Sequence, residues 1–309
     1  MNIENYDVVI IGAGPAGMCA AIYAKRAGLN VALLEKNYPG GQIVITDEIE
    51  NYPGFFEKIS GYELANKLLR HCQKFGIEPQ ITVIQKIELS KKFAGHKIYT
   101  ENVIYETKSI IFCNGANPRK LNISGEAEFT GRGVSYCATC DAAFFKNKKV
   151  AVIGGGDSAL EEALYLTKFV DKLFLIHRRD KFRALKIIVD KVMANPKIEL
   201  VLETIPLKII GEKNVKGLTL KNVKTEKITE LAIDGVFIFA GYIANTEIIP
   251  QEIEKDENGY IVVDKKQQTN IKGVFAAGDI CSKFLRQVIT ACSDGAIAAI
   301  AAMHYIDSV

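Results

Sequence analysis

The chain of 309 residues has no tryptophan, only four histidines and no dominant block of basic residues behind its net charge of +3. Proteins bind nucleic acids and membrane surfaces through clustered Lys and Arg. The chain also lacks a hydrophobic run long enough to cross a bilayer, which takes about 20 residues. Its longest apolar run near the C-terminus covers only residues 296–303. We expect neither nucleic acid nor membrane among the partners.

Signal-peptide features are missing as well, because residues 1–7 carry acids where a signal peptide would carry bases. Cysteine occurs seven times, an odd number, and only Cys137 and Cys140 are closely spaced. A secreted disulfide scaffold would show more pairs. The pattern fits a reducing compartment with one redox-active pair, so we expect a cytoplasmic protein. Its length allows two domains, each with its own core.

What the chain does contain is a nucleotide-binding pattern near its start. A β-branched apolar run at 7–11 leads into the glycine turn Gly12-Ala13-Gly14-Pro15-Ala16-Gly17. A helix is predicted over 18–27, and a second buried strand, 31–34, ends in Glu35. Strand, glycine turn, helix, strand and acid in this order form the dinucleotide-binding βαβ unit.

Each glycine of this turn has a physical role. Gly12 permits the tight turn, Gly14 lets a pyrophosphate approach the backbone, and Gly17 allows close packing of helix on strand. The helix N-terminus offers free N–H groups to the anion. Glu35 lies where a carboxylate accepts a hydrogen bond from the adenosine ribose.

The same plan recurs at 149–176. A strand at 149–153 precedes Gly154-Gly155-Gly156-Asp157-Ser158-Ala159, and a helix at 160–168 and a strand at 172–176 follow. No acid ends this second strand. The chain reads His177-Arg178-Arg179-Asp180-Lys181-Phe182-Arg183 instead, and three arginines accommodate a ribose 2′-phosphate that a carboxylate would repel. We expect NADP(H) here, the alternative being a solvated basic helix start.

Between the two units lies Cys137-Ala138-Thr139-Cys140-Asp141. Two such cysteines can cycle between dithiol and disulfide, and Asp141 can exchange a proton with the thiolates. The motif alone is ambiguous, because a CxxC is also half of a zinc site. Zinc needs more Cys or His ligands than the sequence visibly supplies nearby, and the flanking nucleotide units favour redox chemistry.

Other segments carry weaker signals. The Gly/Pro segments 38–42 and 50–54 are either simple turns or a wrapping around a large flat ligand, and the sequence leaves both interpretations open. Cys72, on the apolar face of a helix at 61–75, and Cys113, at a strand end, are predicted to lie in the core. Cys281 and Cys292 are spaced for neither zinc nor a redox pair, which indicates structural roles.

The C-terminal part continues the nucleotide pattern. An apolar strand at 273–279 ends in Gly278-Asp279, where ligands bind in α/β folds. A helix over 287–305 would direct the positive end of its dipole, near Arg286-Gln287-Val288, at a flavin's carbonyl groups. Strands ending in glycine at 112–116 and 237–242 complete two copies of one plan. We therefore expect two different nucleotides.

The motifs form a specific combination along nearly the whole chain: Gly12–Gly17, Gly40-Gly41-Gln42, Asn51-Tyr52-Pro53-Gly54, Gly131–Ser135, Cys137–Asp141, Gly154–Ala159, His177–Asp180, Ala277–Asp279 and Arg286-Gln287. With these motifs the sequence resembles low-molecular-weight, bacterial-type thioredoxin reductase. The resemblance implies an α/β fold of two Rossmann-like domains, the second inserted into the first. Residues 1–116 and 246–309 would bind FAD, and residues 117–245 would bind NADPH and carry the cysteine pair.

The resemblance also implies thioredoxin as substrate, a homodimer, and catalytic roles for Cys137, Cys140 and Asp141. Cys140 would lie nearer the flavin, and Cys137 would exchange with thioredoxin. The implied FAD contacts are Gly12, Gly14, Pro15, Ala16, Gly17, Glu35, Gly41, Gln42, Asn51, Val83, Gly115, Gly278, Asp279, Arg286, Gln287 and Val288. The implied NADPH contacts are Gly154, Gly156, Asp157, Ser158, Ala159, His177, Arg178, Arg179 and Arg183.

Three residues depart from the family pattern: Asp157 replaces the usual Asn, Ala142 a Gly, and Asn114 a Thr. A negative charge at Asp157 could weaken NADPH binding, and some relatives take electrons from ferredoxin instead. The intact His177-Arg178-Arg179 argues against that alternative. Another disulfide carrier in place of thioredoxin is a further alternative. Because NADPH and the cysteines would share one domain, we expect rotation at linkers near 117–118 and 244–245.

Overall fold

The computed structural model describes residues 2–46, 49, 51–90 and 95–309. The chain forms two compact units. One extends up to Asn117 and resumes at Ile243, and the other, Pro118–Tyr242, is inserted between these parts. The chain passes from one unit to the other on β7 (Ala116–Pro118) and β16 (Tyr242–Ala244), which pair with each other.

The first unit is built on a sheet of order β3-β2-β1-β6-β5-β4, with β17 on the other side of β6. Parallel pairing joins β1 (Asn2–Ile11), β2 (Val31–Glu35), β3 (Gln80–Ile81), β6 (Val103–Phe112) and β17 (Val274–Ala276). The short strands β4 (Lys86–Glu88) and β5 (His96–Tyr99) are antiparallel. The apolar runs of β1 and β6 are fully buried, as expected for strands covered on both faces.

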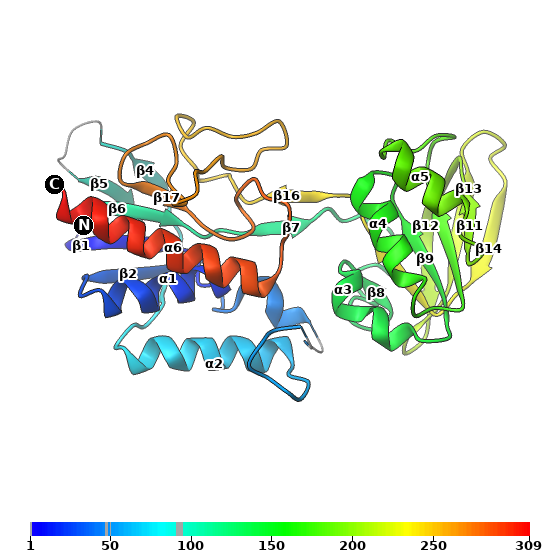
Figure 1. Cartoon of the computed structure of the whole chain (residues 1–309), viewed down its shortest axis with the longest axis horizontal. Coiled ribbons are helices and arrows are strands. Elements are labelled where there is room, and N and C mark those ends of the chain that lie inside the picture. Colours follow the sequence, from blue (N-terminus) through cyan, green and yellow to red (C-terminus); the bar gives the residue numbers. More distant parts are fainter. Residues whose placement is uncertain (1, 47–48, 50, 91–94) are drawn as a thin grey trace. The chain divides into compact units, whose positions relative to one another are not determined.

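The described residues of this unit form the α-helices α1 (Pro15–Arg26), α2 (Gly61–Lys74) and α6 (Val288–Asp307), and a short 3₁₀ helix η1 (Gly41–Ile45). In Figure 1, α1 (blue) and α6 (red) lie side by side, with α2 beyond α1. A Cβ on Gly295 would lie 2.1 Å from the carbonyl oxygen of Ala16, so the two backbones touch. By length and composition α6 could cross a membrane, but its small residues pack on α1 as in a core helix.

The second unit has a parallel sheet of order β11-β10-β9-β15-β8. Its strands are β8 (Val134–Ser135), β9 (Lys149–Ile153), β10 (Lys172–Ile176), β11 (Ile198–Val201) and β15 (Gly235–Ile238). Its helices are α3 (Ala138–Asp141), η2 (Ala142–Phe145), α4 (Asp157–Leu166) and α5 (Lys186–Met193). A separate antiparallel sheet contains β12 (Thr204–Gly211), β13 (Val215–Asn222) and β14 (Ile228–Ala232).

The expected α/β architecture, with one parallel-sheet unit inserted into another, is confirmed. Both glycine-turn helices begin three residues earlier than predicted, at Pro15 and Asp157. Proline is compatible with the first turn of a helix, and an acidic residue there is stabilised by the helix dipole. The alternating sequence over 81–112 is typical of short antiparallel strands, and the pairs β4–β5 and β5–β6 are antiparallel. β6 also pairs in parallel with β1 and β17, which the alternation did not predict.

Candidate functional site

The first glycine turn is held so tightly that side chains are excluded from two of its positions. Gly12 has a φ of +106°, and a Cβ there would lie 2.4 Å from the carbonyl oxygen of Cys113. A Cβ on Gly17 would lie 1.8 Å from the carbonyl oxygen of Gly12. Gly14 is different, since its nearest such contact is 3.9 Å away. The turn is therefore packed from behind and leaves room at Gly14 for a pyrophosphate.

Glu35 ends β2 next to this turn. Its Oε2 accepts a hydrogen bond from the backbone N–H of Ala13 at 2.8 Å, and its Oε1 accepts one from the N–H of Asn37 at 2.9 Å. The carboxylate is thereby held beside the glycine turn. Each carboxylate oxygen can accept a second hydrogen bond, so the geometry still permits contact with a ribose hydroxyl.

Two buried oxygen atoms of the first unit lack a hydrogen-bond donor among the described residues. They are Oδ1 of Asp279, which follows β17, and Oδ1 of Asn114, which follows β6. Burial raises the pKa of the Asp279 carboxyl, while Lys283 and Arg286 oppose the rise. Buried polar atoms are normally paired. These two unpaired oxygen atoms could accept hydrogen bonds from a ligand that carries hydroxyl groups, such as the ribityl chain of a flavin.

Hydrogen bonds join the Gly/Pro segments to the N-cap of α6 and to β7. The side-chain amide of Asn51 donates to Oε1 of Gln287 at 3.0 Å, and that of Gln42 donates to Oδ1 of Asn117 at 2.6 Å. The Arg286 guanidinium lies over the ring of Tyr260 at 4.1 Å. The fold thus brings together Asn51 and Gln287, two residues distant in sequence that were both expected to contact FAD.

The remaining expected FAD residues are distributed around these positions. Pro15 and Ala16 begin α1, Gly41 begins η1, and Val288 begins α6. Gly115 and Gly278 adopt positive φ angles of 67° and 82° at the ends of β6 and β17. Val83, in the loop after β3, is 57% exposed. The FAD contacts of these residues stay predictions.

The second glycine turn repeats the arrangement of the first. A Cβ on Gly154 would lie 2.4 Å from the Cβ of Ala159, and one on Gly155 would lie 2.2 Å from the ring of His177. A Cβ on Gly156 would meet nothing within 4 Å. Gly156 is therefore the open position of this turn, and Ser158 and Ala159 lie in the first turn of α4 beyond it.

The basic segment 177–183 is not helical, because α5 begins only at Lys186. The alternative of a basic helix start was therefore wrong. His177 is buried beneath Gly155, and burial, with Arg178 and Arg179 nearby, lowers its pKa. The three arginines 178, 179 and 183 are exposed at the end of β10. They form a solvent-facing cationic group, as a 2′-phosphate site requires.

Two hydrogen bonds fasten the loop 177–185, which contains the basic segment, to the second glycine turn. The backbone N–H of Arg183 donates to the carbonyl oxygen of Gly155 at 2.8 Å. The N–H of Leu185 donates to Oδ1 of Asp157 at 2.7 Å. The Asp157 carboxylate, suspected from sequence of opposing a pyrophosphate, thus anchors the loop that carries the arginines. No sequence pattern indicates this contact, because the partner of the carboxylate is a backbone N–H.

The cysteine pair is a disulfide. Cys137 and Cys140 are bonded, with 5.4 Å between their Cα atoms, and Cys137 caps the N-terminus of α3. The Ser135 hydroxyl accepts from the N–H of Cys137 and donates to its carbonyl oxygen, both at 3.1 Å. Asp141 ends α3 one residue after Cys140. Joined sulfurs of this kind are poised for thiol–disulfide exchange rather than for holding zinc.

Comparison with known proteins decides the family. The family model for pyridine nucleotide-disulphide oxidoreductases matches residues 6–295. A thioredoxin reductase of Treponema pallidum is 46% identical over 304 residues, covering 98% of each chain. The chain belongs to the thioredoxin reductase family. It is an oxidoreductase, and its Cys137–Cys140 disulfide is consistent with the redox centre of that family.

Solved structures agree with this membership. The crystal structure of thioredoxin reductase from Streptococcus pyogenes is 45% identical, covers 99% of both chains and has a TM-score of 0.92. A ferredoxin-flavin thioredoxin reductase from Clostridium acetobutylicum is 31% identical, covers 100% of both chains and has a TM-score of 0.54. The expected resemblance and the fold of two Rossmann-like domains are both confirmed.

Proposed function

We propose that this member of the family is an NADPH-dependent thioredoxin-disulfide reductase. Electrons would pass from NADPH through FAD and the Cys137–Cys140 disulfide to oxidised thioredoxin. The observation that carries the proposal is the Cys137–Cys140 disulfide, in the same compact unit as an arginine-bearing second nucleotide turn. Thioredoxin is the proposed substrate because relatives of nearly the same length are named thioredoxin reductases.

FAD is assigned to the first unit, which extends up to Asn117 and resumes at Ile243. Gly14 would admit its pyrophosphate, Glu35 would accept from its ribose, and the unpaired Asp279 oxygen would accept from its ribityl chain. The N-terminus of α6 at Val288 would face its carbonyl groups. When bound, the flavin supplies the two-electron step between a nicotinamide and a disulfide.

NADPH is assigned to the second unit, Pro118–Tyr242. The open position at Gly156 would receive its pyrophosphate, and Arg178, Arg179 and Arg183 would bind its 2′-phosphate. The arginines can do so because Asp157 and the Gly155 carbonyl hold their loop against the turn. The absence of an acid at the end of β10 removes the group that would favour NADH.

The protein's own residues perform the disulfide exchange. After reduction, the Cys137 thiolate would attack the disulfide of thioredoxin and form a mixed disulfide. Cys140 would then attack the Cys137 sulfur and release reduced thioredoxin. Asp141 would give a proton to the departing thiolate or take one from the attacking thiol. Ser135 would hold the Cys137 backbone in place throughout.

Rotation between the two units would let NADPH and the cysteines reach one flavin in turn. Both groups belong to Pro118–Tyr242, whereas the FAD residues belong to the other unit. The two connecting strands pair with each other, and Asn117 donates to Oδ1 of Asn245 at 2.9 Å. They can therefore act as one hinge. A cross-link between the units should stop turnover and leave FAD bound, and continued cycling would contradict the rotation.

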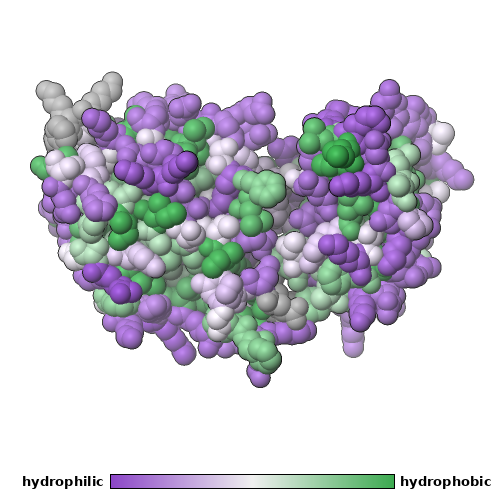
Figure 2. All heavy atoms as spheres, viewed as in Figure 1, coloured by the Kyte–Doolittle hydropathy of each residue, from purple (hydrophilic) through white to green (hydrophobic). Residues whose placement is uncertain are grey.

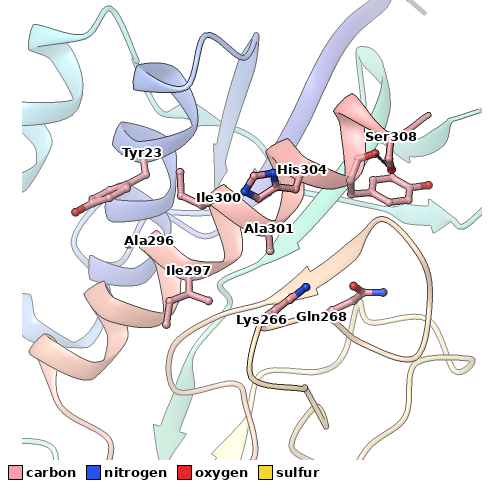
Figure 3. Close-up of a pocket in the computed structure, with 10 residues that line it drawn as sticks. Tyr23, Lys266, Gln268, Ala296, Ile297, Ile300, Ala301, His304 and Ser308 are labelled. Atoms are coloured by element: carbon pink, nitrogen blue, oxygen red, sulfur yellow. Dashed lines mark hydrogen bonds between the residues drawn. The ribbon is translucent and has the colours of Figure 1, made fainter.

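A homodimer is proposed through the exposed face of α6. Apolar residues lie among hydrophilic ones on the face where α6 runs (Figure 2), and Ile289 and Ile297 are 43% and 39% exposed. A pocket of about 670 Å³ lies there, with Tyr23 of α1, Ile297 and His304 of α6, and Lys266 of a nearby loop around it (Figure 3). Ile297→Glu should produce monomers in sedimentation experiments. An unchanged sedimentation coefficient would place the interface elsewhere.

The proposed activity is tested by anaerobic titration with NADPH and then thioredoxin while the flavin spectrum is followed. Bleaching by NADPH and recovery on addition of oxidised thioredoxin are expected. No bleaching would favour a ferredoxin-fed reductase instead, the activity that the name of the Clostridium acetobutylicum relative describes. Cys137→Ser should abolish thioredoxin reduction and retain flavin bleaching. If the flavin absorbance recovered only with a different disulfide protein, that protein would replace thioredoxin as the proposed substrate. A cytoplasmic location is proposed with this activity.

A further inference from the structure

Two cysteines outside the Cys137–Cys140 pair meet in the first unit. Cys19 lies on α1, and Cys292 lies near the start of α6. Their thiols are hydrogen-bonded to each other. The Cys292 sulfur also lies 3.8 Å from the hydroxyl of Tyr52 and 3.8 Å from the carbonyl oxygen of Pro15. Sequence spacing could not reveal this pair, because its members are at opposite ends of the chain.

The backbones of α1 and α6 are close enough at this point for a covalent link. A Cβ on Gly295 would lie 2.1 Å from the carbonyl oxygen of Ala16 and 3.0 Å from the backbone nitrogen of Ala20. Cys19 lies between these two alanines, and Cys292 lies one helical turn before Gly295. A disulfide requires Cα atoms within about 7 Å, which such a contact between small residues allows.

The two sulfurs differ in reactivity. Hydrogen bonds from the Cys19 thiol and the Tyr52 hydroxyl lower the pKa of Cys292, although burial opposes them. The hydrogen bond with Cys292, together with burial, raises the pKa of Cys19. Burial raises the pKa of Cys72 and of Cys281 to about 12. Cys292 is therefore the nucleophile that two donors stabilise, with Cys19 beside it and partly exposed.

We propose that Cys19 and Cys292 form a second dithiol–disulfide pair, which hydrogen peroxide oxidises. The Cys292 thiolate attacks one peroxide oxygen, so that an S–O bond forms, the O–O bond breaks and the leaving hydroxide takes up a proton to become water. The Cys19 sulfur then attacks the sulfenic sulfur, the S–O bond breaks and a second water leaves. Two thiols lose two electrons and two protons, which the peroxide accepts.

The disulfide would fasten α1 to α6 directly behind the first glycine turn. The Pro15 carbonyl that contacts Cys292 belongs to that turn, and the Tyr52 that contacts it follows Asn51. Oxidation would therefore fix the segments expected to surround a dinucleotide. The pair lies apart from Cys137 and Cys140 in the other unit, so its oxidation can be measured without reference to the reductase activity proposed above.

The test uses the full-length protein with Cys137–Cys140 left oxidised, which has five free cysteines. Titration with one equivalent of hydrogen peroxide should lower the thiol count from five to three. Mass spectrometry of a non-reduced digest should then find the Cys19 and Cys292 peptides joined and two hydrogens lighter than their sum. Dithiothreitol should reduce this cross-link together with the Cys137–Cys140 disulfide, so that the thiol count rises from three to seven. Cys72→Ser should leave the cross-link intact, whereas Cys19→Ser should eliminate it.

The proposal is overturned by any of three results. Five thiols could persist at peroxide concentrations that oxidise free cysteine. Cys292 could become a sulfinic acid while Cys19 stays reduced. A different pair of cysteines could be joined. The peptide measurement needs no substitution at Cys19 or Cys292, so a variant that fails to fold cannot conceal the outcome.

Discussion

Replacement of Asp157 tests whether its carboxylate opposes NADPH binding by repelling the pyrophosphate or supports it by anchoring the arginine loop. If its carboxylate repels the NADPH pyrophosphate, Asp157→Ala should lower KM for NADPH. The structure predicts the reverse, because Oδ1 of Asp157 accepts the N–H of Leu185 at 2.7 Å and thereby holds the loop that carries Arg178, Arg179 and Arg183. Loss of the anchor lets the loop leave the position in which its arginines would meet a 2′-phosphate.

The magnitude follows from the kind of bond. A hydrogen bond to a charged group contributes about 1.5–3 kcal/mol, and this one is exposed to solvent, so we expect about 1 kcal/mol. That value corresponds to about a five-fold rise in KM. Asp157→Asn keeps an acceptor at the same position and should lose about half of the effect. KM for NADH should change little, since NADH has no 2′-phosphate.

Steady-state kinetics with NADPH and NADH at fixed thioredoxin checks this expectation. Asp180→Asn is the matched control, because it removes the same charge from the basic segment, where Asp180 is exposed, and leaves the Leu185 hydrogen bond intact. A lower KM for NADPH in Asp157→Ala, or an equal effect of Asp180→Asn, would refute the anchoring role.

Two further predictions concern stability. Burial raises the pKa of the Glu162 carboxyl from 4.5 to about 6. The free energy of unfolding should therefore fall by up to about 2 kcal/mol as pH rises from 4.5 to 6, because the unfolded chain ionises more readily than the folded protein. Screening of the charge by water reduces this loss. Glu162→Gln should therefore stabilise the protein above pH 6 and flatten the pH profile of urea unfolding. Exposed Glu161→Gln should have a smaller effect in the same direction, because repulsion from Glu161 is the lesser cause of the raised pKa. Equal effects of the two variants would contradict burial as the main cause. Gly12→Ala should lower the free energy of unfolding by about 3 kcal/mol in the same assay. Gly12 has a φ of +106°, and the new Cβ would lie 2.4 Å from the carbonyl oxygen of Cys113. Gly28→Ala, at φ +85° with nothing within 4 Å, should cost only about 1 kcal/mol, and identical losses would exclude the clash.

The sequence predicted the local units well. The strand at 149–153 and the strand at 172–176 have the bounds expected of them, and Cys72 and Cys113 are buried as predicted. Each of these signals lies within a few consecutive residues, where apolar runs and glycines restrict the backbone. Helix starts were less accurate, because proline and aspartate can occupy the first turn as well as end a loop.

Contacts across the fold were not predictable in the same way. The bond between Asn51 and Gln287, at 3.0 Å, and the pairing of Cys19 with Cys292 join residues from opposite ends of the chain. The interpretation of Cys292 as structural rested on its distance from other cysteines along the sequence. Only the packing of α6 on α1 puts a second thiol beside it.

By itself the sequence determined the two glycine-turn units, the missing acid after the second one, and the CxxC motif between them. These features are local, since each depends on neighbouring residues and on backbone conformations that few residue types can adopt. The tertiary structure alone decided that Asp157 accepts from Leu185 and that Cys292 meets Cys19. Such contacts depend on how helices and loops pack, and the free energy of packing is shared among residues far apart in the chain.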